Sequence, residues 1–205
     1  MKYKTLYLGP MPTNSYLFYD ESTNNAVIFD PGYDHNEIIK QIQKYGLLLK
    51  FIVLTHGHGD HIEAVSKLRE ITNAKLVMTY EDIELIGSSE LNYSQMVYGT
   101  KTEIKEPPEI VIHDGDILLC DSLAFKCVKT PGHTKGSCVF LIDDIMISGD
   151  TIFQYGCGRT DLYGGSGKDL ACSLRKLFAL PYNYKILPGH GNQTTLFEQK
   201  QYFSL

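Results

Sequence analysis

The sequence lacks the features that mark several classes of protein. Lys and Arg form no cluster along its 205 residues and the net charge is −5, so nucleic acid would find no basic surface to bind. No apolar run approaches the roughly 20 residues that span a membrane. The first apolar stretch is cut short at Gly9-Pro10, before it could serve as a signal peptide. We therefore predict a protein that binds neither nucleic acid nor membrane.

Cysteine is scarce, and its spacing forms no metal-binding or disulfide framework. The five cysteines are odd in number and contain no CxxC pair. This usage is typical of reduced, mostly buried thiols, which predicts a cytoplasmic protein. The chain also lacks low-complexity tracts, and 43% of its residues are hydrophobic and 21% charged. These values are typical of a globular domain, and we expect a single domain spanning residues 1–205.

Apolar periodicity predicts a chain in which strands precede a helix twice. Because both halves repeat this order, we expect an α/β fold of two sheets packed face to face with helices outside, a four-layer αββα sandwich. Residues 87–108 break the pattern; they are polar and form either a partial cover over the site or an ordinary surface connection. The expected strands are 3–8, 14–19, 26–29, 50–54, 75–79, 109–112, 117–120, 123–129, 137–142, 144–148 and 184–187. The expected helices follow Asp34 (to Tyr45), Asp60 (burying Ile62, Val65, Leu68 and Ile71), residue 80 and Lys168, with a short one after His190.

The most informative stretch is Thr55-His56-Gly57-His58-Gly59-Asp60-His61, which directly follows an apolar strand. His56 and His58 are two residues apart, so in extended geometry their side chains lean to one side and can bind one cation. Asp60 and His61 follow flexible glycines and can turn toward a second position. Imidazole and carboxylate ligands suit Zn, Fe or Mn, and the absence of thiolate disfavours a structural zinc site.

Three further candidate ligands lie where apolar strands end. They are His133, Asp150 and His190, each preceded by a glycine that lets the backbone turn tightly. One such residue at a strand end means little. Three of them alongside the first cluster are hard to explain by packing, so we predict that they complete a metal site.

In chain order, Asp30, the HxHxDH motif at 56–61, His133, Asp150 and His190 resemble the five-motif signature of the metallo-β-lactamase superfamily. The resemblance covers nearly the whole chain and implies the fold of that family. It also implies that His56, His58 and His133 hold one metal, that Asp60, His61 and His190 hold another, and that Asp150 bridges the two. Asp30 would lie behind the ligands and fix the loops beneath them.

Within the superfamily, Gly149-Asp150-Thr151-Ile152-Phe153 and Gly156-Cys157-Gly158-Arg159 resemble hydroxyacylglutathione hydrolase, or glyoxalase II. The basic residue that ends the second motif helps to bind the glutathione part of the thioester in that enzyme, and Arg159 stands there. Only 15 residues follow His190, so we expect no C-terminal helical glutathione-binding domain. The chain is more similar to short glyoxalase II-like hydrolases.

The ligand set predicts a hydrolase with two divalent cations, zinc first and iron or manganese as alternatives. Two cations about 3.5–4 Å apart would lower the pKa of a shared water from near 16 to about 7 and supply hydroxide at neutral pH. The expected substrate is a small thioester resembling S-lactoylglutathione. Asp60 would also act catalytically, because its carboxylate can hold the proton of the hydroxide and so orient the hydroxide's lone pair.

Two other functions remain open on the sequence. Persulfide dioxygenases resemble short glyoxalase II proteins but use one iron held by two histidines and an aspartate, for which His56, His133 and Asp150 are available. A binding protein without turnover is disfavoured, because seven converging polar groups without metal would be costly. No pattern indicates an oligomeric state.

Several other residues have plain structural interpretations. We expect His35 and His113 to lie in solvated turns, Cys157 to be structural, and Tyr93 and Tyr98 to be partly buried packing groups. Arg159 has two interpretations of similar weight, substrate binding and a pair with Asp161 that orders the glycine-rich loop.

Overall fold

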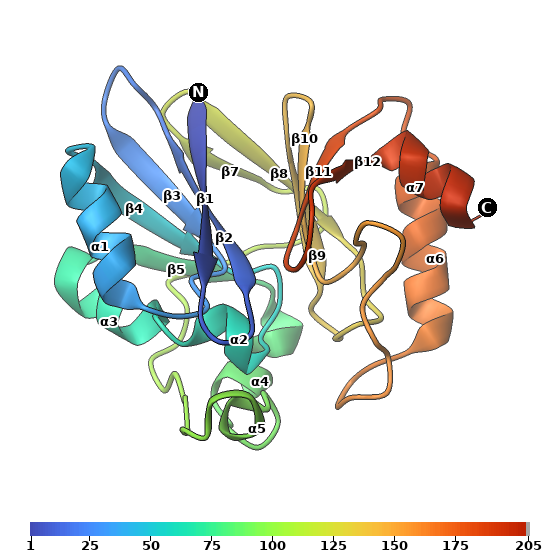
Figure 1. Cartoon of the computed structure of the whole chain (residues 1–205), viewed down its shortest axis with the longest axis horizontal. Helices are drawn as coiled ribbons and strands as arrows, with labels where there is room; N and C mark the ends of the chain where they lie inside the picture. The colour runs from blue at the N-terminus through green and yellow to red at the C-terminus, as the bar shows by residue number, and fades with distance from the viewer. Residues whose placement is uncertain (204–205) are drawn as a thin grey trace.

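The computed structural model describes residues 1–203, and Figure 1 shows its layers. Over these residues the chain forms two six-stranded sheets that face each other, with helices on both outer faces. The four-layer α/β sandwich predicted from the sequence is therefore confirmed. No helix within residues 1–203 is long and apolar enough to cross a membrane.

The N-terminal sheet has the strand order β1-β2-β3-β4-β5-β6. The first three strands pair antiparallel and the last three join the sheet in parallel, because helical crossovers separate them. Parallel pairing brings the carboxyl ends of β3, β4 and β5 to one edge. The strands are β1 (Lys2–Leu8), β2 (Thr13–Tyr19), β3 (Asn25–Phe29), β4 (Leu48–Val53), β5 (Lys75–Met78) and β6 (Ile110–Val111).

The C-terminal sheet has the order β12-β11-β10-β9-β8-β7, and within it only β10 and β11 pair in parallel among the residues described. The strands are β7 (Ile117–Cys120), β8 (Leu123–Lys129), β9 (Cys138–Ile142), β10 (Ile145–Gly149), β11 (Lys185–Pro188) and β12 (Thr194–Thr195).

The longer helices cover the sheets, and the shorter ones lie in the loops at one edge (Figure 1). The helices are α1 (His35–Lys44), α2 (Gly59–Ile62), α3 (Val65–Thr72), the 3-10 turn η1 (Tyr80–Asp82), α4 (Ile83–Ile86), α5 (Ser94–Tyr98), α6 (Gly167–Phe178) and α7 (Leu196–Phe203).

Three apolar clusters fill the three interfaces between the four layers. One joins α1 and α3 to the N-terminal sheet through residues such as Ile38 and Leu68. The central cluster lies between the sheets and contains the packed rings of Phe18, Phe29 and Phe125. The third joins α6 to the C-terminal sheet. The sandwich thus buries both faces of each sheet, which leaves the site to the loops at the sheet edge.

Three local features differ from the sequence prediction. Ile71 does not share the buried face of Val65 and Leu68; it is 52% exposed. At 100° per residue, Thr72 rather than Ile71 continues that face. Residues 87–108 contain the short helix α5. The two-residue strand β12 pairs with β11 at the edge of the C-terminal sheet. Both elements are too short for periodicity to reveal.

Candidate metal centre

Five loops from both sheets converge at one edge of the sandwich. Asp30 follows β3, the segment 55–61 follows β4, His133 lies between β8 and β9, Asp150 follows β10 and His190 follows β11. Residues at these strand ends are placed by the buried strands that precede them. The sequence-predicted ligands are therefore brought together from positions up to 134 residues apart.

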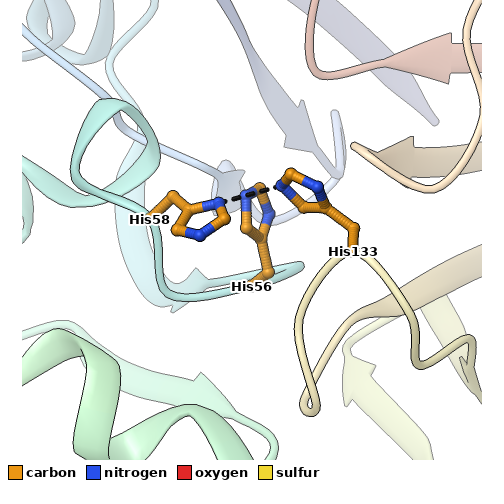
Figure 2. Close-up of side chains that lie close together, drawn as sticks. All are labelled: His56, His58 and His133. Carbon is orange, nitrogen blue, oxygen red and sulfur yellow. Dashed lines mark hydrogen bonds between the residues drawn. The ribbon is translucent and has the colours of Figure 1, made fainter. Parts of the chain in front are cut away.

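One group consists of three buried imidazoles. His56, His58 and His133 each offer a nitrogen, and these atoms lie within 4.8 Å of one another. The Nδ1 atom of His58 is 2.9 Å from the Nε2 atom of His133. Figure 2 shows the three rings converging, with His133 arriving from a loop of the opposite sheet.

A second group consists of Asp60, His61 and His190, whose ligand atoms also lie within 4.8 Å of one another. The Nε2 atom of His190 is 3.0 Å from Asp60 Oδ2, and the Nε2 atom of His61 is 3.7 Å from the same oxygen. Asp60 lies in the first turn of α2, whose N-cap is His58. The change from extended backbone to helix directs Asp60 toward His190, while the ring of His61 stays close to that of His56, with ring centres 4.2 Å apart.

Asp150 lies between the two groups. Its Oδ1 atom is 3.3 Å from His61 Nε2, whereas its Oδ2 atom is 3.6 Å from His133 Nε2 and 3.7 Å from His190 Nε2. One carboxylate thus faces imidazoles of both groups, as the bridging position implied by the resemblance requires. A Cβ atom on Gly189 would lie 2.2 Å from Asp150 Oδ1, so glycine at this position is what admits the carboxylate.

Hydrogen bonds outside the site orient three of the rings, two of them through backbone carbonyls. His133 Nδ1 donates to the carbonyl oxygen of Arg159 (2.8 Å), and His190 Nδ1 donates to that of Pro12 (3.0 Å). Carbonyl oxygens only accept, so when these rings are neutral the unprotonated nitrogen is Nε2, which faces the site. This arrangement is the one in which protein histidines bind metals.

Thr55 orients a third ring, and Asp30 lies beside a fourth. Asp30 Oδ1 accepts from the Thr55 backbone N–H (2.8 Å), and its Oδ2 accepts from the Thr55 hydroxyl (2.7 Å). Because the hydroxyl proton is used, His56 Nδ1 donates to Thr55 Oγ1 (3.1 Å). The Nδ1 atom of His61 lies 3.1 Å from Asp30 Oδ2. Asp30 therefore lies beneath the ligands, where the resemblance places it.

Several inward-facing atoms are buried without a hydrogen-bond partner among residues 1–203. They are His56 Nε2, His58 Nε2, both ring nitrogens of His61 and Asp150 Oδ1. For His61 the neighbouring carboxylates are close, but their alignment does not meet hydrogen-bond geometry. Unsatisfied buried polar atoms are costly, and a cation relieves that cost. Nitrogen and oxygen donors without sulfur fit Zn, Fe or Mn.

The pKa values of the imidazoles shift in opposite directions in the two groups. Burial lowers the pKa of His56 well below its usual range and the pKa of His58 to about 3, because neighbouring imidazoles add to the effect. Burial also acts against protonated His61, but the carboxylates of Asp150, Asp60 and Asp30 outweigh it and raise its pKa. Metal binding at His61 must therefore displace a proton.

A cavity of about 330 Å³ opens above the ligands. His58, Asp60, His133, Asp150 and His190 contribute to its lining, and the remaining wall is mostly apolar. The apolar contributors are Met11, Tyr93, Met96, Val97, Phe153 and Leu162. Residues 92–97 thus cover part of the site, which decides between the two roles left open for residues 87–108.

Arg159 forms the pair with Asp161 that was one of its two sequence interpretations, and its role in substrate binding stays a prediction. It lines the cavity, and its guanidinium makes two 2.7 Å hydrogen bonds to the carboxylate of Asp161. Both side chains are exposed, so water and salt weaken the pair and it can open for a substrate. Cys157 is half-buried against the α6 cluster, and burial raises its pKa.

The tyrosines of residues 87–108 have different environments. Tyr98 is a packing group whose hydroxyl donates to the Gly32 carbonyl (3.2 Å) and whose ring lies 5.0 Å from that of Tyr33. Tyr93 reaches the cavity, with its ring centre 5.9 Å from that of His58. His35 and His113 belong to none of the candidate metal groups within residues 1–203.

The sequence reasoning missed two residues that shape the site. Thr55 links Asp30 to His56, and the buried carboxylate of Asp82 contacts the loops on either side of the first imidazole group. Thr55 could have been found, because it directly precedes the HxHxDH motif. Asp82 carries no local signal, since its partners come from loops 25 and 52 residues away.

The sequence model of the Metallo-beta-lactamase superfamily matches residues 8–190. The chain belongs to this superfamily. Among relatives of the superfamily, it is 35% identical to the probable metallo-hydrolase YqgX of Bacillus subtilis, over 98% of this chain and 96% of that protein. It is 32% identical to the hydroxyacylglutathione hydrolase GloC of Haemophilus influenzae, over 92% and 90% of the two chains.

Solved structures of the superfamily share the whole sandwich. The crystal structure of the B3 metallo-beta-lactamase BLEG-1 matches with a TM-score of 0.91 and 32% identity, covering 98% of this chain and 97% of that one. TTHA1623 in a di-iron-bound form matches with a TM-score of 0.86 and 30% identity, covering 97% of each chain. ETHE1 from Myxococcus xanthus matches with a TM-score of 0.79 and 30% identity, covering 98% and 83%. Superfamily membership and the His/Asp cluster together show a metal-dependent hydrolase.

Proposed function

We propose that this metallo-hydrolase cleaves small thioesters at a centre of two divalent cations. The observation that carries the proposal is the pair of three-ligand groups with the Asp150 carboxylate between them. His56, His58 and His133 would hold one cation, and Asp60, His61 and His190 the other. We propose zinc as the metal, and iron is the main alternative because a superfamily neighbour binds two irons.

When bound, the cations would lower the pKa of a shared water to about 7 and polarise the substrate carbonyl. The protein supplies the remaining requirements. Asp60 lies at the cavity floor and in the first turn of α2, where its second carboxylate oxygen can accept the proton of the attacking water and orient its lone pair. The carboxylate's other oxygen would remain a ligand.

The cavity supports a small-molecule substrate of partly apolar character. Its volume of about 330 Å³ is at the lower end of ligand-binding sites, and Met96, Phe153 and Leu162 form part of its wall. Arg159 would bind a polar or anionic part of the thiol carrier at the rim. The similarity to GloC supports a glutathione thioester such as S-lactoylglutathione. The free thiols of residues 1–203 support a cytoplasmic location.

The test is a thioester panel on protein that has been stripped by chelation and reloaded with Zn²⁺, Fe²⁺ or Mn²⁺. We expect two metal ions per chain and cleavage of S-lactoylglutathione or of a related acyl thioester, with chelated protein inactive. The matched control is Asp150→Asn, which removes the bridging charge at nearly constant shape. Two bound metals without cleavage of any thioester in the panel would refute the substrate proposal and leave the metal centre standing.

A mononuclear iron oxidoreductase is the second candidate. It is favoured by the similarity to ETHE1 and by the positions of His133 and Asp150, whose Nε2 and Oδ2 atoms are 3.6 Å apart. With His56 they would hold one iron. Oxygen uptake with glutathione persulfide by protein containing one iron per chain would establish this function in place of hydrolysis.

A further inference from the structure

Asp82 is a fully buried carboxylate that lies outside the proposed ligand set. It ends the 3-10 turn η1 and has no exposed surface. Three donors satisfy it: Asp82 Oδ2 accepts from the Gly57 backbone N–H (2.9 Å) and from the Thr134 hydroxyl (2.6 Å), and its Oδ1 accepts from the Gly136 backbone N–H (2.7 Å). Such charge-assisted hydrogen bonds are among the strongest in proteins.

The donors come from the two loops that form the first imidazole group. Gly57 lies between His56 and His58, whereas Thr134 directly follows His133 and Gly136 lies two residues further on. The first loop leaves the N-terminal sheet and the second belongs to the C-terminal sheet. Asp82 therefore joins the two sheets at the point where His58 Nδ1 and His133 Nε2 come to 2.9 Å from each other.

The surroundings of Asp82 hold it in this position. Thr79, at the other end of the same turn, donates from its hydroxyl to the Gly136 carbonyl (2.6 Å). A Cβ atom on Gly136 would lie 2.5 Å from Thr79 Oγ1 and 2.6 Å from Asp82 Cγ. The glycine thus lets the His133 loop approach the turn closely, and two hydrogen bonds from that turn fix it there.

We propose that Asp82 is a positioning residue that sets the spacing between the His56–His58 loop and the His133 loop for metal binding. The inference rests on the metal centre proposed above. Without the Asp82 carboxylate, Gly57 N–H, Gly136 N–H and the Thr134 hydroxyl lose their shared acceptor. The two loops then lose their shared anchor at this point and depend more on the metal for their spacing, so metal affinity falls while the sandwich persists.

The test compares Asp82→Asn with Asp20→Asn. Asp20 is also buried, and its carboxylate also accepts several hydrogen bonds, from the backbone and hydroxyls of Ser22 and Ser122. Asp20 follows the last residue of β2. Asn14 lies at the other end of that strand, where its side chain donates to the Pro188 carbonyl near the site. The control therefore matches the loss of a buried carboxylate but spares the ligand loops.

Zn²⁺ affinity is measured by competition with a chromophoric chelator, and the visible spectrum of the Co²⁺ form reports ligand geometry. We expect Asp82→Asn to bind the first metal about 10–100-fold more weakly than the unmodified protein, with an altered Co²⁺ spectrum. Asp20→Asn should lose thermal stability in its metal-free form but keep both the affinity and the spectrum.

Equal metal affinity in Asp82→Asn and the unmodified protein would overturn the inference and leave Asp82 as an ordinary brace. If Asp82→Asn does not fold, Thr134→Val provides the same measurement, because it removes one hydroxyl donor to Asp82 at constant shape. Its affinity should fall several-fold, and an unchanged affinity would also overturn the inference. Failure of the unmodified protein to bind metal would instead refute the proposed metal centre.

Discussion

Replacing Gly149 by alanine should destabilise the protein more than its backbone conformation alone requires. Gly149 ends β10, directly before Asp150, and its φ is +47°. An added Cβ atom would lie 2.1 Å from Thr55 Oγ1. That hydroxyl donates to Asp30 and accepts from His56, so the added methyl group displaces a group that orients one of the proposed ligands.

The magnitude follows from two separate contributions. A left-handed conformation costs a non-glycine residue about 1–2 kcal/mol. Overpacking against the Thr55 side chain adds about 1–3 kcal/mol. Gly46 isolates the first contribution, because its φ is +61° and an added Cβ atom there has no neighbour within 4 Å among residues 1–203. We therefore expect Gly149→Ala to exceed Gly46→Ala by about 1–3 kcal/mol.

The assay is urea denaturation of both variants and the unmodified protein, each stripped of metal, so that only folding is measured. Zn²⁺ affinity is then determined for the same samples and should fall in Gly149→Ala but not in Gly46→Ala. If both variants lose the same free energy of unfolding, Thr55 does not constrain the end of β10, and the proposed coupling of Asp30, Thr55 and His56 to the site is wrong.

Three further predictions concern charge, metal and substrate. Burial lowers the pKa of His58 to about 3 in the metal-free fold against 6.5 when unfolded, so the unfolded state takes up the proton first and stability falls with pH below about 6.5. Between about pH 6 and about pH 4.5, His58 should lower the free energy of unfolding by about 2 kcal/mol. Urea titrations should show that this loss is absent in His58→Gln and present in the exposed control His113→Gln. Zn²⁺ at about 100 times its dissociation constant should add about 2.7 kcal/mol to the free energy of unfolding. A melting temperature that changes neither with Zn²⁺ nor with a chelator would contradict the metal centre. Arg159→Ala should raise KM for a glutathione thioester with little change in kcat, and an unchanged KM would show that Arg159 serves only its pair with Asp161.

Local sequence patterns predicted the strands and helices that are long enough to show a period. The strands β3, β4, β8 and β10 appear as apolar or alternating runs, and the turn signals after them locate Asp30, His56, His133 and Asp150. Because each candidate ligand lies within a few residues of the end of a strand, its place along the chain and at the edge of a sheet could be predicted. Short elements such as α5 could not, since five residues do not establish a period.

The residue types alone indicated a metal site, because imidazoles and carboxylates spaced as in HxHxDH have few other uses. Only the folded chain shows that Asp150 faces imidazoles of both groups and that the carbonyls of Arg159 and Pro12 orient His133 and His190. Backbone carbonyls are the same in every residue, so a sequence cannot indicate which of them accepts a hydrogen bond.

The sequence by itself determined which groups are available to bind a cation and that they follow buried strands, because residue type and hydrophobic period are local properties. The tertiary structure decided the rest: that α5 forms part of the cavity wall, that Arg159 lies at the rim beside Asp161, and that Asp82 joins the two sheets beneath His58 and His133. These relations depend on distances between segments that are far apart in the chain, and such distances are set only when the two sheets pack against each other.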